Sequence, residues 1–481
     1  MLTLDSPERL YSTRLRTAVV LTGSGTSGAY HAGVLRALHE AGVRIDLVAG
    51  RGMGAATAMF AAVDGGTRLW EPNGVWKGRD ATGFYGWRTA LKVAAWALVA
   101  AGAVLLFPLL LFTIAIALGI VAFVLTLIGF EQAGSALTSG FSSRLGALFA
   151  PAALPTTVPR LVLLGVLVAV AALAVNVAVR HFSGGAKRRT QSGVLPLLWR
   201  LIGNPLTARH AFETFTAELW KLIKGAAPIQ QPRQAELGRR YLELLAENLG
   251  QPGFRELLVV LHDLDARQDV VFAFLAESHR PGFFARPTLA GGAAARMSEA
   301  FDLSGVARDH AMDMLSASLA MPVATEPHLM TFATEGPWRG ETHQLCDRPG
   351  SLARLIDEVA AAGAEQVVLL SAAPRPARPH ELSARRADLR GAAGAQLGAF
   401  ESAALRDALE QFAARFAGIY VIRPEHNPLG PLDFRGLHDE RSDRRYTLAE
   451  LVDRGYEDAY RQFIDPVVGA SGERMQSVEL N

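Results

Sequence analysis

Every residue from Val93 to Phe130 lacks a charged side chain, and most are Ala, Val, Leu, Ile or Phe. A second uncharged apolar stretch runs from Leu161 to Val179. A helix crosses a bilayer with about 20 apolar residues, so the first stretch has room for two crossings and the second for one. The alternative, a buried helix of a soluble domain, does not need such length. We therefore expect a transmembrane helical insertion over residues 91–182.

Basic residues flank this insertion on both sides. Those before it are Lys77, Arg79, Arg88 and Lys92, and those after it are Arg180, Lys187, Arg188 and Arg189. The segment between the two apolar stretches contains only two basic residues, Arg144 and Arg160. Lys and Arg concentrate on the cytoplasmic side of membrane proteins. The charges therefore predict an integral inner or plasma membrane protein whose soluble domain faces the cytoplasm.

Residues 18–54, before the insertion, have the pattern of alternating strands and helices. Ala18 to Leu21 is a short apolar run, and it is followed by a glycine-rich loop. Residues 31–40 then place apolar side chains on one helical face. Ile45 to Ala49 is a second apolar run, and the tight turn Gly50-Arg51-Gly52-Met53-Gly54 opens another helix. The pattern predicts strand, loop, helix, strand and turn.

This arrangement resembles the beginning of the patatin-like phospholipases, a family of lipid acyl hydrolases. In that family a glycine loop forms the oxyanion hole, and a Gly-x-Ser-x-Gly elbow presents the nucleophile. The resemblance implies an α/β fold, a three-layer patatin-like domain with a mainly parallel sheet, interrupted by the transmembrane insertion. Residues 1–90 and 183–468 then make one domain, the latter part with a helical insertion of its own, and residues 469–481 form a disordered tail.

A single domain built from both flanks requires an even number of membrane crossings, because both flanks must lie on the same side. Either the first apolar stretch makes one crossing plus a re-entrant piece near Pro108, or residues 133–154 supply a weaker fourth crossing. We expect two net crossings. The segment 193–224 mixes Trp and Leu with basic residues, which fits a helix at the membrane surface or an amphipathic helix of the core equally well.

The elbow of this chain lacks the nucleophile. Gly50 and Gly54 match the elbow glycines, but Gly52 occupies the serine position. The oxyanion or anion-binding loop comprises Gly23, Ser24, Gly25 and Gly28. Its backbone N–H groups and the helix that follows are suited to an anion. Ser27 stands where the family has a basic residue.

A second resemblance concerns the catalytic aspartate. Ala317-Ser318-Leu319-Ala320-Met321-Pro322 resembles the segment that precedes the family's Asp-Gly-Gly motif. The next candidate here is Glu335, in Thr334-Glu335-Gly336-Pro337, which then takes the vestigial aspartate position. Asp64-Gly65-Gly66 spells the motif, but it follows Gly52 along a helix by about 18 Å, so we interpret Asp64 as a helix stop.

These residues leave two hypotheses. The first is a membrane-anchored, catalytically silent pseudohydrolase that binds membrane lipid or an acyl chain, because Gly52 has no side chain to attack a substrate. The alternative is an active phospholipase or lipid acyl hydrolase with a non-standard nucleophile such as Ser24 or Ser27. A transporter or channel is less favoured, because the apolar stretches lack ionisable residues.

The sequence contains no motif that indicates another partner or a cofactor. The net charge of +2 gives no argument for nucleic acid. We expect no cofactor and no metal, and interpret His262, Asp263 and Asp265 as a polar helix face rather than metal ligands. The single cysteine, Cys346, excludes an intrachain disulfide. The sequence names no protein partner.

Overall fold

The computed structural model describes residues 11–183, 203–225, 227–286, 296, 298–336, 338–376, 389–439 and 444–469. The chain forms two compact units, one made of residues 1–86 and 206–481 and the other of residues 87–205. The basic residues Lys187, Arg188 and Arg189, residues 193–202, and the predicted tail from residue 470 lie outside the described residues.

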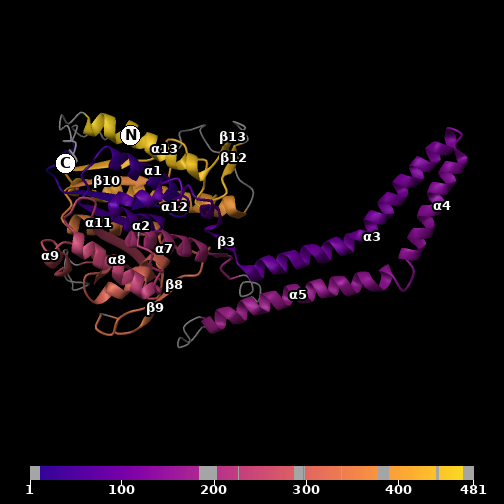
Figure 1. The fold of residues 1–481 in the computed structure, drawn as a ribbon, viewed down its shortest axis with the longest axis horizontal. Helices are drawn as coiled ribbons and strands as arrows, with labels where there is room; N and C mark the ends of the chain where they lie inside the picture. The colour runs from indigo at the N-terminus through magenta and orange to yellow at the C-terminus, as the bar shows by residue number, and fades with distance from the viewer. Residues whose placement is uncertain are drawn as a thin grey trace. The chain divides into compact units, whose positions relative to one another are not determined.

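The first unit is a mixed α/β structure built on one nine-stranded sheet (Figure 1). Its strands are β1 (Thr17–Thr22), β2 (Leu47–Arg51), β5 (Glu256–Asp263), β6 (Gln268–Phe274), β7 (Ser298–Asp302), β8 (His328–Thr331), β9 (Thr342–Cys346), β10 (Gln366–Ser371) and β11 (Gly418–Ile422). The order is β11-β10-β1-β2-β5-β6-β7, and β9 pairs with β5 and β8. Strands β11 to β5 along this path are parallel, whereas β5 pairs antiparallel with β6 and β9. The sheet is therefore mostly parallel, as the sequence predicts.

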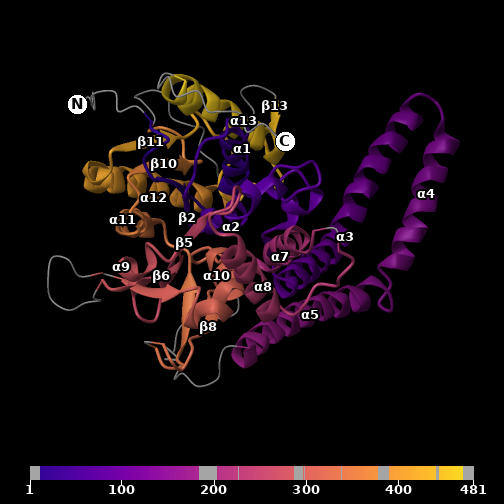
Figure 2. The same ribbon diagram turned by 60° about the vertical axis from the view of Figure 1, so that its left-hand side comes forward.

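Helices cover both faces of this sheet (Figures 1 and 2). One face packs against α1 (Ser27–Glu40), α2 (Met53–Ala61), α7 (Arg209–Lys224), α8 (Gln234–Asn248), α10 (Ala311–Ser318) and α13 (Leu448–Ala459). The other packs against α9 (Arg280–Phe284), α11 (Leu352–Ala361) and α12 (Leu389–Phe412). Alternate residues of β1 show the division: Val19 and Leu21 belong to the first core, Ala18 and Val20 to the second.

The remaining elements of the first unit are short. Two small ladders are β3 (Gly86–Trp87) with β4 (Leu206–Thr207) and β12 (Leu437–Asp439) with β13 (Arg444–Tyr446). Short helical turns are η1 (Asp64–Leu69), η2 (Arg79–Gly83), η3 (Val306–His310), η4 (Pro349–Ser351), η5 (Ala413–Arg415) and η6 (Tyr460–Val468). Helix α7 buries Phe215, Leu219 and Trp220, so this part of segment 193–224 is an amphipathic core helix.

The second unit is a helical hairpin of α3 (Thr89–Leu127), α4 (Glu131–Leu148) and α5 (Leu154–Ser183). Helix α3 continues through Pro108 for 39 residues, so the first apolar stretch forms one helix rather than two. Within the described residues, α3 and Leu154–Val179 are the two helices long and apolar enough to cross a membrane. Two such helices satisfy the even number that both flanks in one domain require.

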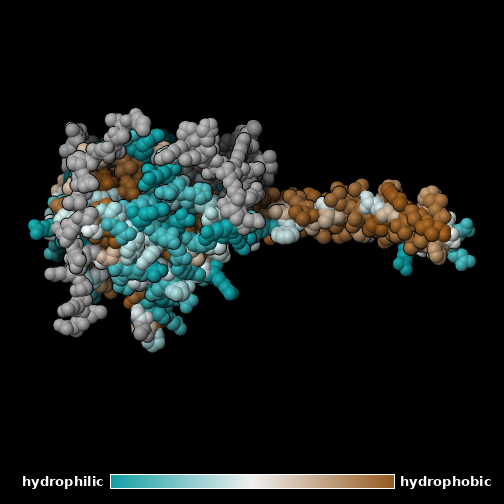
Figure 3. Space-filling model, turned by 90° about the horizontal axis from the view of Figure 1, so that it is seen from above, coloured by the Kyte–Doolittle hydropathy of each residue, from teal (hydrophilic) through white to brown (hydrophobic). Residues whose placement is uncertain are grey.

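The surface of the second unit is largely hydrocarbon (Figure 3). Side chains such as Leu109, Phe123 and Leu167 expose 65%, 66% and 56% of their area. Soluble proteins rarely expose contiguous apolar patches of this kind. The length, composition and exposure of α3 and α5 therefore point to association with a membrane.

Candidate functional site

The elbow lies at the carboxyl ends of β1 and β2, where ligands of open parallel sheets usually bind. Strand β2 ends at Arg51, α2 begins at Met53, and Gly52 stands between them with φ 56° and ψ −135°. A positive φ of this kind is adopted freely by glycine and at a cost by residues with a side chain. The turn thus has the strand-to-helix form of a nucleophile elbow, with a hydrogen atom in place of the side chain.

Asp347 is the carboxylate that faces Gly52. A Cβ atom added to Gly52 would lie 2.5 Å from Oδ2 of Asp347 and 2.8 Å from the carbonyl oxygen of Gly23. Asp347 directly follows β9, and its N–H donates to the carbonyl of Ala320 over 3.0 Å. The segment 317–322 therefore lies beside Asp347.

Glu335, by contrast, is exposed in the turn between β8 and β9. The antiparallel β8–β9 hairpin carries the chain outward after β8 and returns it to the sheet at β9, where Cys346 pairs with His262 of β5. The residue that arrives at the elbow is consequently the one after β9. The carboxylate that lies beside Gly52 is therefore that of Asp347, and the expected position of Glu335 opposite Gly52 is wrong.

Arg51 fills the site with a buried ion network. Its Nη1 donates to Oδ1 of Asp347 over 2.9 Å, and its Nη2 donates to Oε2 of Glu401 on α12. Ser24 donates to Oδ2 of Asp347 over 2.7 Å and lies 3.4 Å from Oε1 of Glu401. The side chain of Arg51 is fully buried, and Asp347, Glu401 and Ser24 are nearly so. A buried network of charged groups thus lies directly beside Gly52.

The strand geometry explains why Arg51 reaches α12. Side chains alternate along β2, and Ala49 belongs to the core that includes α11 and α12. Arg51, two residues later, points to the same face and meets Glu401 there. The guanidinium thus joins the elbow to Asp347 and to the helix layer that includes α12.

The charges of the network depend on one another. Burial alone opposes the charged guanidinium, but Glu401 and Asp347 outweigh it and raise the pKa of Arg51 above its usual range. Burial raises the pKa of Glu401, with a further contribution from Asp347 and an opposing one from Arg51. Because a buried charge left without its partner is very costly, the three groups act as one unit.

The glycine loop is packed against protein atoms. A Cβ on Gly25 would collide with the carbonyl of Pro431, and one on Gly28 with the ring of Trp76. The N–H of Met53, which follows the nucleophile position and would serve an oxyanion hole, donates to the carbonyl of Gly23 over 2.9 Å. The elbow glycines Gly50 and Gly54 are likewise packed against backbone atoms.

A Cβ on Gly54 would meet the carbonyl of Leu21, and one on Gly50 would meet that of Gly54. The glycines at the elbow and in the loop therefore allow close approach of protein backbone and side chains. Anion binding by this loop stays a prediction.

Neither serine of the loop has a general base of the usual kind. The hydroxyl of Ser24 is bonded to Asp347, which already pairs with Arg51. The buried hydroxyl of Ser27 has no hydrogen-bond partner within the described part of the chain. His31 of α1 is bonded through Nε2 to the carbonyl of Thr22, and burial lowers its pKa to about 3. It is therefore neutral.

The other candidate residues lie elsewhere in the fold. Asp64 is exposed, and its carboxylate accepts from Thr67 in the turn after α2, in agreement with a helix stop. His262 is bonded to Asp269 over 2.8 Å, and Asp263 to His343; they lie on a strand, not on a helix. Among the described residues there is no group of three or more His, Cys, Asp or Glu that could hold a metal ion.

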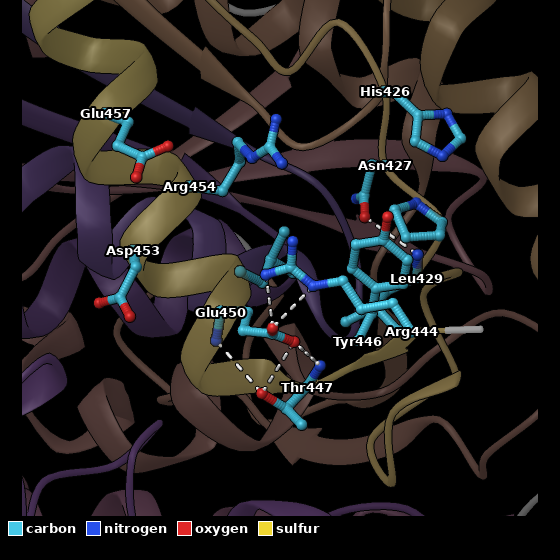
Figure 4. Close-up of a pocket in the computed structure, with 12 residues that line it drawn as sticks. His426, Asn427, Leu429, Arg444, Tyr446, Thr447, Glu450, Asp453, Arg454 and Glu457 are labelled. Atoms are coloured by element: carbon cyan, nitrogen blue, oxygen red, sulfur yellow. Dashed lines mark hydrogen bonds and ion pairs between the residues drawn. The ribbon is translucent and has the colours of Figure 1, made fainter. Parts of the chain in front are cut away.

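A cavity of about 230 Å³ lies between α13 and the loop that begins at His426 (Figure 4). Arg444 and Glu450 form an ion pair of 2.8 Å at its rim, and Thr447 caps α13 through Glu450. Gly52, Asp347 and Glu401 do not line it. The cavity is thus distinct from the elbow.

Comparison with known proteins does not assign the chain to a family. No protein-family model matches the chain, and no curated protein matches it. Among solved structures, the crystal structure of VipD from Legionella pneumophila is similar at 11% sequence identity and a TM-score of 0.26, covering 95% of this chain and 68% of that one. This TM-score is too low to establish a shared fold, so the assignment of roles rests on the geometry of the chain itself.

Proposed function

We propose that the protein is a membrane-anchored, catalytically silent pseudohydrolase with a patatin-like domain. The single observation that carries the proposal is the elbow, where Gly52 replaces the nucleophile and the space of the missing side chain faces Asp347 at 2.5 Å. The glycine loop, the elbow turn and the carboxylate after β9 support the patatin-like character. The absence of a hydroxyl at the elbow, together with the bonded Met53 N–H, supports the loss of hydrolysis.

The lipid partner in this proposal is the bilayer around α3 and α5. Their exposed apolar side chains would contact acyl chains, and the basic residues that flank them would lie at the cytoplasmic surface. Binding of a separate acyl group at the elbow is not favoured, because Arg51, Asp347 and Glu401 are buried there and the glycine loop is packed. In this proposal the lipid is therefore bound by the anchor and not by the elbow.

One observation favours the alternative of an active hydrolase. Ser24 donates a 2.7 Å hydrogen bond to Asp347, which has the form of a serine–aspartate dyad. Such a dyad needs a carboxylate free to accept the proton, and here Arg51 engages the same carboxylate. The dyad also needs access for a substrate, whereas Ser24 is 3% exposed. These contacts favour a structural role for Ser24.

Labelling of the full chain in lipid nanodiscs with a fluorophosphonate probe tests the two functions. We expect no labelling of the native protein or of the matched variants Ser24→Ala and Ser27→Ala. Gly52→Ser should also remain unlabelled, because its Cβ would crowd Asp347 and the carbonyl of Gly23. Labelling of the native protein that is lost in Ser24→Ala and kept in Ser27→Ala would establish the hydrolase instead.

A further inference from the structure

The hairpin of the second unit is about twice as long as a bilayer is thick. Helix α3 has 39 residues, which at 1.5 Å per residue is about 58 Å, against about 30 Å of hydrocarbon. The uncharged part of α5, Leu161 to Val179, lies between Arg160 and Arg180 and measures about 28 Å. The uncharged part of α5 therefore has the length of one crossing, whereas α3 is long enough for about two.

The hairpin consists of two sections in series. Gly165 of α5 packs against Ala97 and Ala101 in the first half of α3. Gly134 of α4 packs against Ala122 and Thr126 in its second half. We call the first half of α3 with α5 the proximal section, and the second half of α3 with α4 the distal section. Small residues at both contacts allow the close helix packing typical of membrane hairpins.

Both arms of the helical hairpin contain a position that favours a bend, and the two positions lie opposite each other. Counting residue for residue from the Gly165 contact places Pro108 opposite Leu154 to Val158, and counting from the Gly134 contact places it opposite Leu148 to Ala152. These residues include the break between α4 and α5. A proline inside a helix removes one backbone hydrogen bond and favours a bend. Figure 1 shows that the hairpin changes direction near the junction of α4 and α5.

The distal section has one apolar and one polar helix. Phe112, Phe123 and Leu127 of α3 are 61–71% exposed. Helix α4 instead contains Glu131 and Arg144 and a series of hydroxyl side chains. Those that bond to the carbonyls of their own helix are Ser135, Thr138, Ser139, Ser142 and Ser143. Such a pair is too apolar for water and too polar for the bilayer centre, and it suits the interface between them.

We propose that the proximal section crosses the membrane and that the distal section turns at the Pro108 level to lie in the lipid interface of the opposite leaflet. The exposed face of α3 would lie at the boundary between headgroups and acyl chains, and α4 would lie toward the water. This inference rests on the proposed membrane anchor. It adds a second, interfacial lipid-binding surface that is separate from the crossing itself.

Fluorescence quenching in nanodiscs measures the depth of each section. Single cysteines at Leu167→Cys, Phe123→Cys and Phe400→Cys would be labelled with a fluorophore, and the unsubstituted chain, whose Cys346 is buried, gives the background. Lipids with a nitroxide near the headgroup or at the chain end then report depth. We expect Leu167→Cys to be quenched best by the chain-end nitroxide, Phe123→Cys by the headgroup nitroxide, and Phe400→Cys of α12 by neither.

The outcomes separate this inference from the anchor. If Leu167→Cys is not quenched by any lipid, the membrane anchor fails, and the inference with it. If Leu167→Cys is quenched but Phe123→Cys responds best to the chain end, the distal section crosses the bilayer and the inference alone is overturned. The same holds if Phe123→Cys shows no lipid quenching and instead cross-links two copies. Adding Pro108→Ala should keep the Leu167→Cys signal and reduce the interfacial signal of Phe123→Cys, and an unchanged Phe123→Cys signal would refute the bend at Pro108.

Discussion

The two units of the protein distribute polar and apolar side chains in opposite ways. In the first unit, Arg51 is fully buried among carboxylates, and the apolar side chains of the sheet are inside. In the second unit, Phe123 and Leu167 expose more than half of their area, and the buried positions are small residues such as Ala101 and Ala122. The first arrangement has an apolar interior, and the second has an apolar surface of the kind that favours association with a membrane. A residue's exposure therefore has meaning only together with the medium that surrounds it.

The largest expected effect is the removal of the buried cation. Arg51→Met leaves Asp347 and Glu401 without their counter-charge, and we expect the free energy of unfolding to fall by about 3–5 kcal/mol. The matched control is Arg209→Met, which breaks the exposed pair with Glu213 on α7 and should cost about 0.5 kcal/mol or less. Denaturant unfolding of the purified protein in detergent measures both. Equal losses in the two variants would show that the network is not a stabilising unit.

A charge on the second unit comes next in size. Leu167→Lys on α5 should oppose membrane insertion by about 2.5–3.5 kcal/mol. The matched control is Phe400 on α12 of the first unit, whose side chain is 59% exposed. Phe400→Lys should change the free energy of unfolding by about 0.5 kcal/mol or less. The fraction of each variant that resists alkaline extraction from membranes measures the difference. If both variants extract alike, the exposed surface of α5 does not face lipid.

Acid should weaken the first unit through His31. Burial lowers its pKa to about 3 from an ordinary value of 6.5, so between these values the unfolded state binds more protons than the folded state. The free energy of unfolding should then fall as the pH falls below 6.5, by about 1 kcal/mol per pH unit. His31→Gln can still donate to the carbonyl of Thr22 and should flatten this dependence. A parallel pH profile of the variant and the native protein would contradict the buried neutral histidine.

Glu401 should give the opposite and smallest dependence. Burial raises the pKa of its carboxyl group, so the folded state binds more protons just above the ordinary value. Its contribution to stability is present at lower pH and is lost as the pH rises through the folded pKa. Glu401→Gln should remove this part of the profile. Thermal unfolding over a pH series would detect it as a difference from the native protein.

The sequence predicted the elbow well because its determinants are local. The apolar runs on either side of the glycine loop and the turn at Gly52 lie within one short segment, and the structure has strand, loop, helix, strand and turn there. The apolar stretches likewise predicted helices of sufficient length. Pro108 lies inside α3 and does not end the helix, so the proline marks a position that favours a bend rather than a boundary between two helices.

The rest of the site depended on contacts between distant residues. Glu335 was chosen because an acidic residue before glycine was expected, whereas the β8–β9 hairpin delivers Asp347 instead. A charged residue at the end of an apolar strand, Arg51, was a signal that a buried counter-charge must exist. Glu401, which supplies it, lies in a helix without a motif, so only the packing of α12 reveals its role.

The order of the strands has a consequence for synthesis. Thr17 of β1 is bonded to Gln366 of β10, 349 positions later in the chain, and the whole hairpin of α3, α4 and α5 is made between them. At about 5–20 residues per second, translation needs on the order of 20–70 s to bring the partner strand out of the ribosome. During this interval the edge of β1 that will pair with β10 has no partner strand, so this part of the sheet can be completed only late in synthesis.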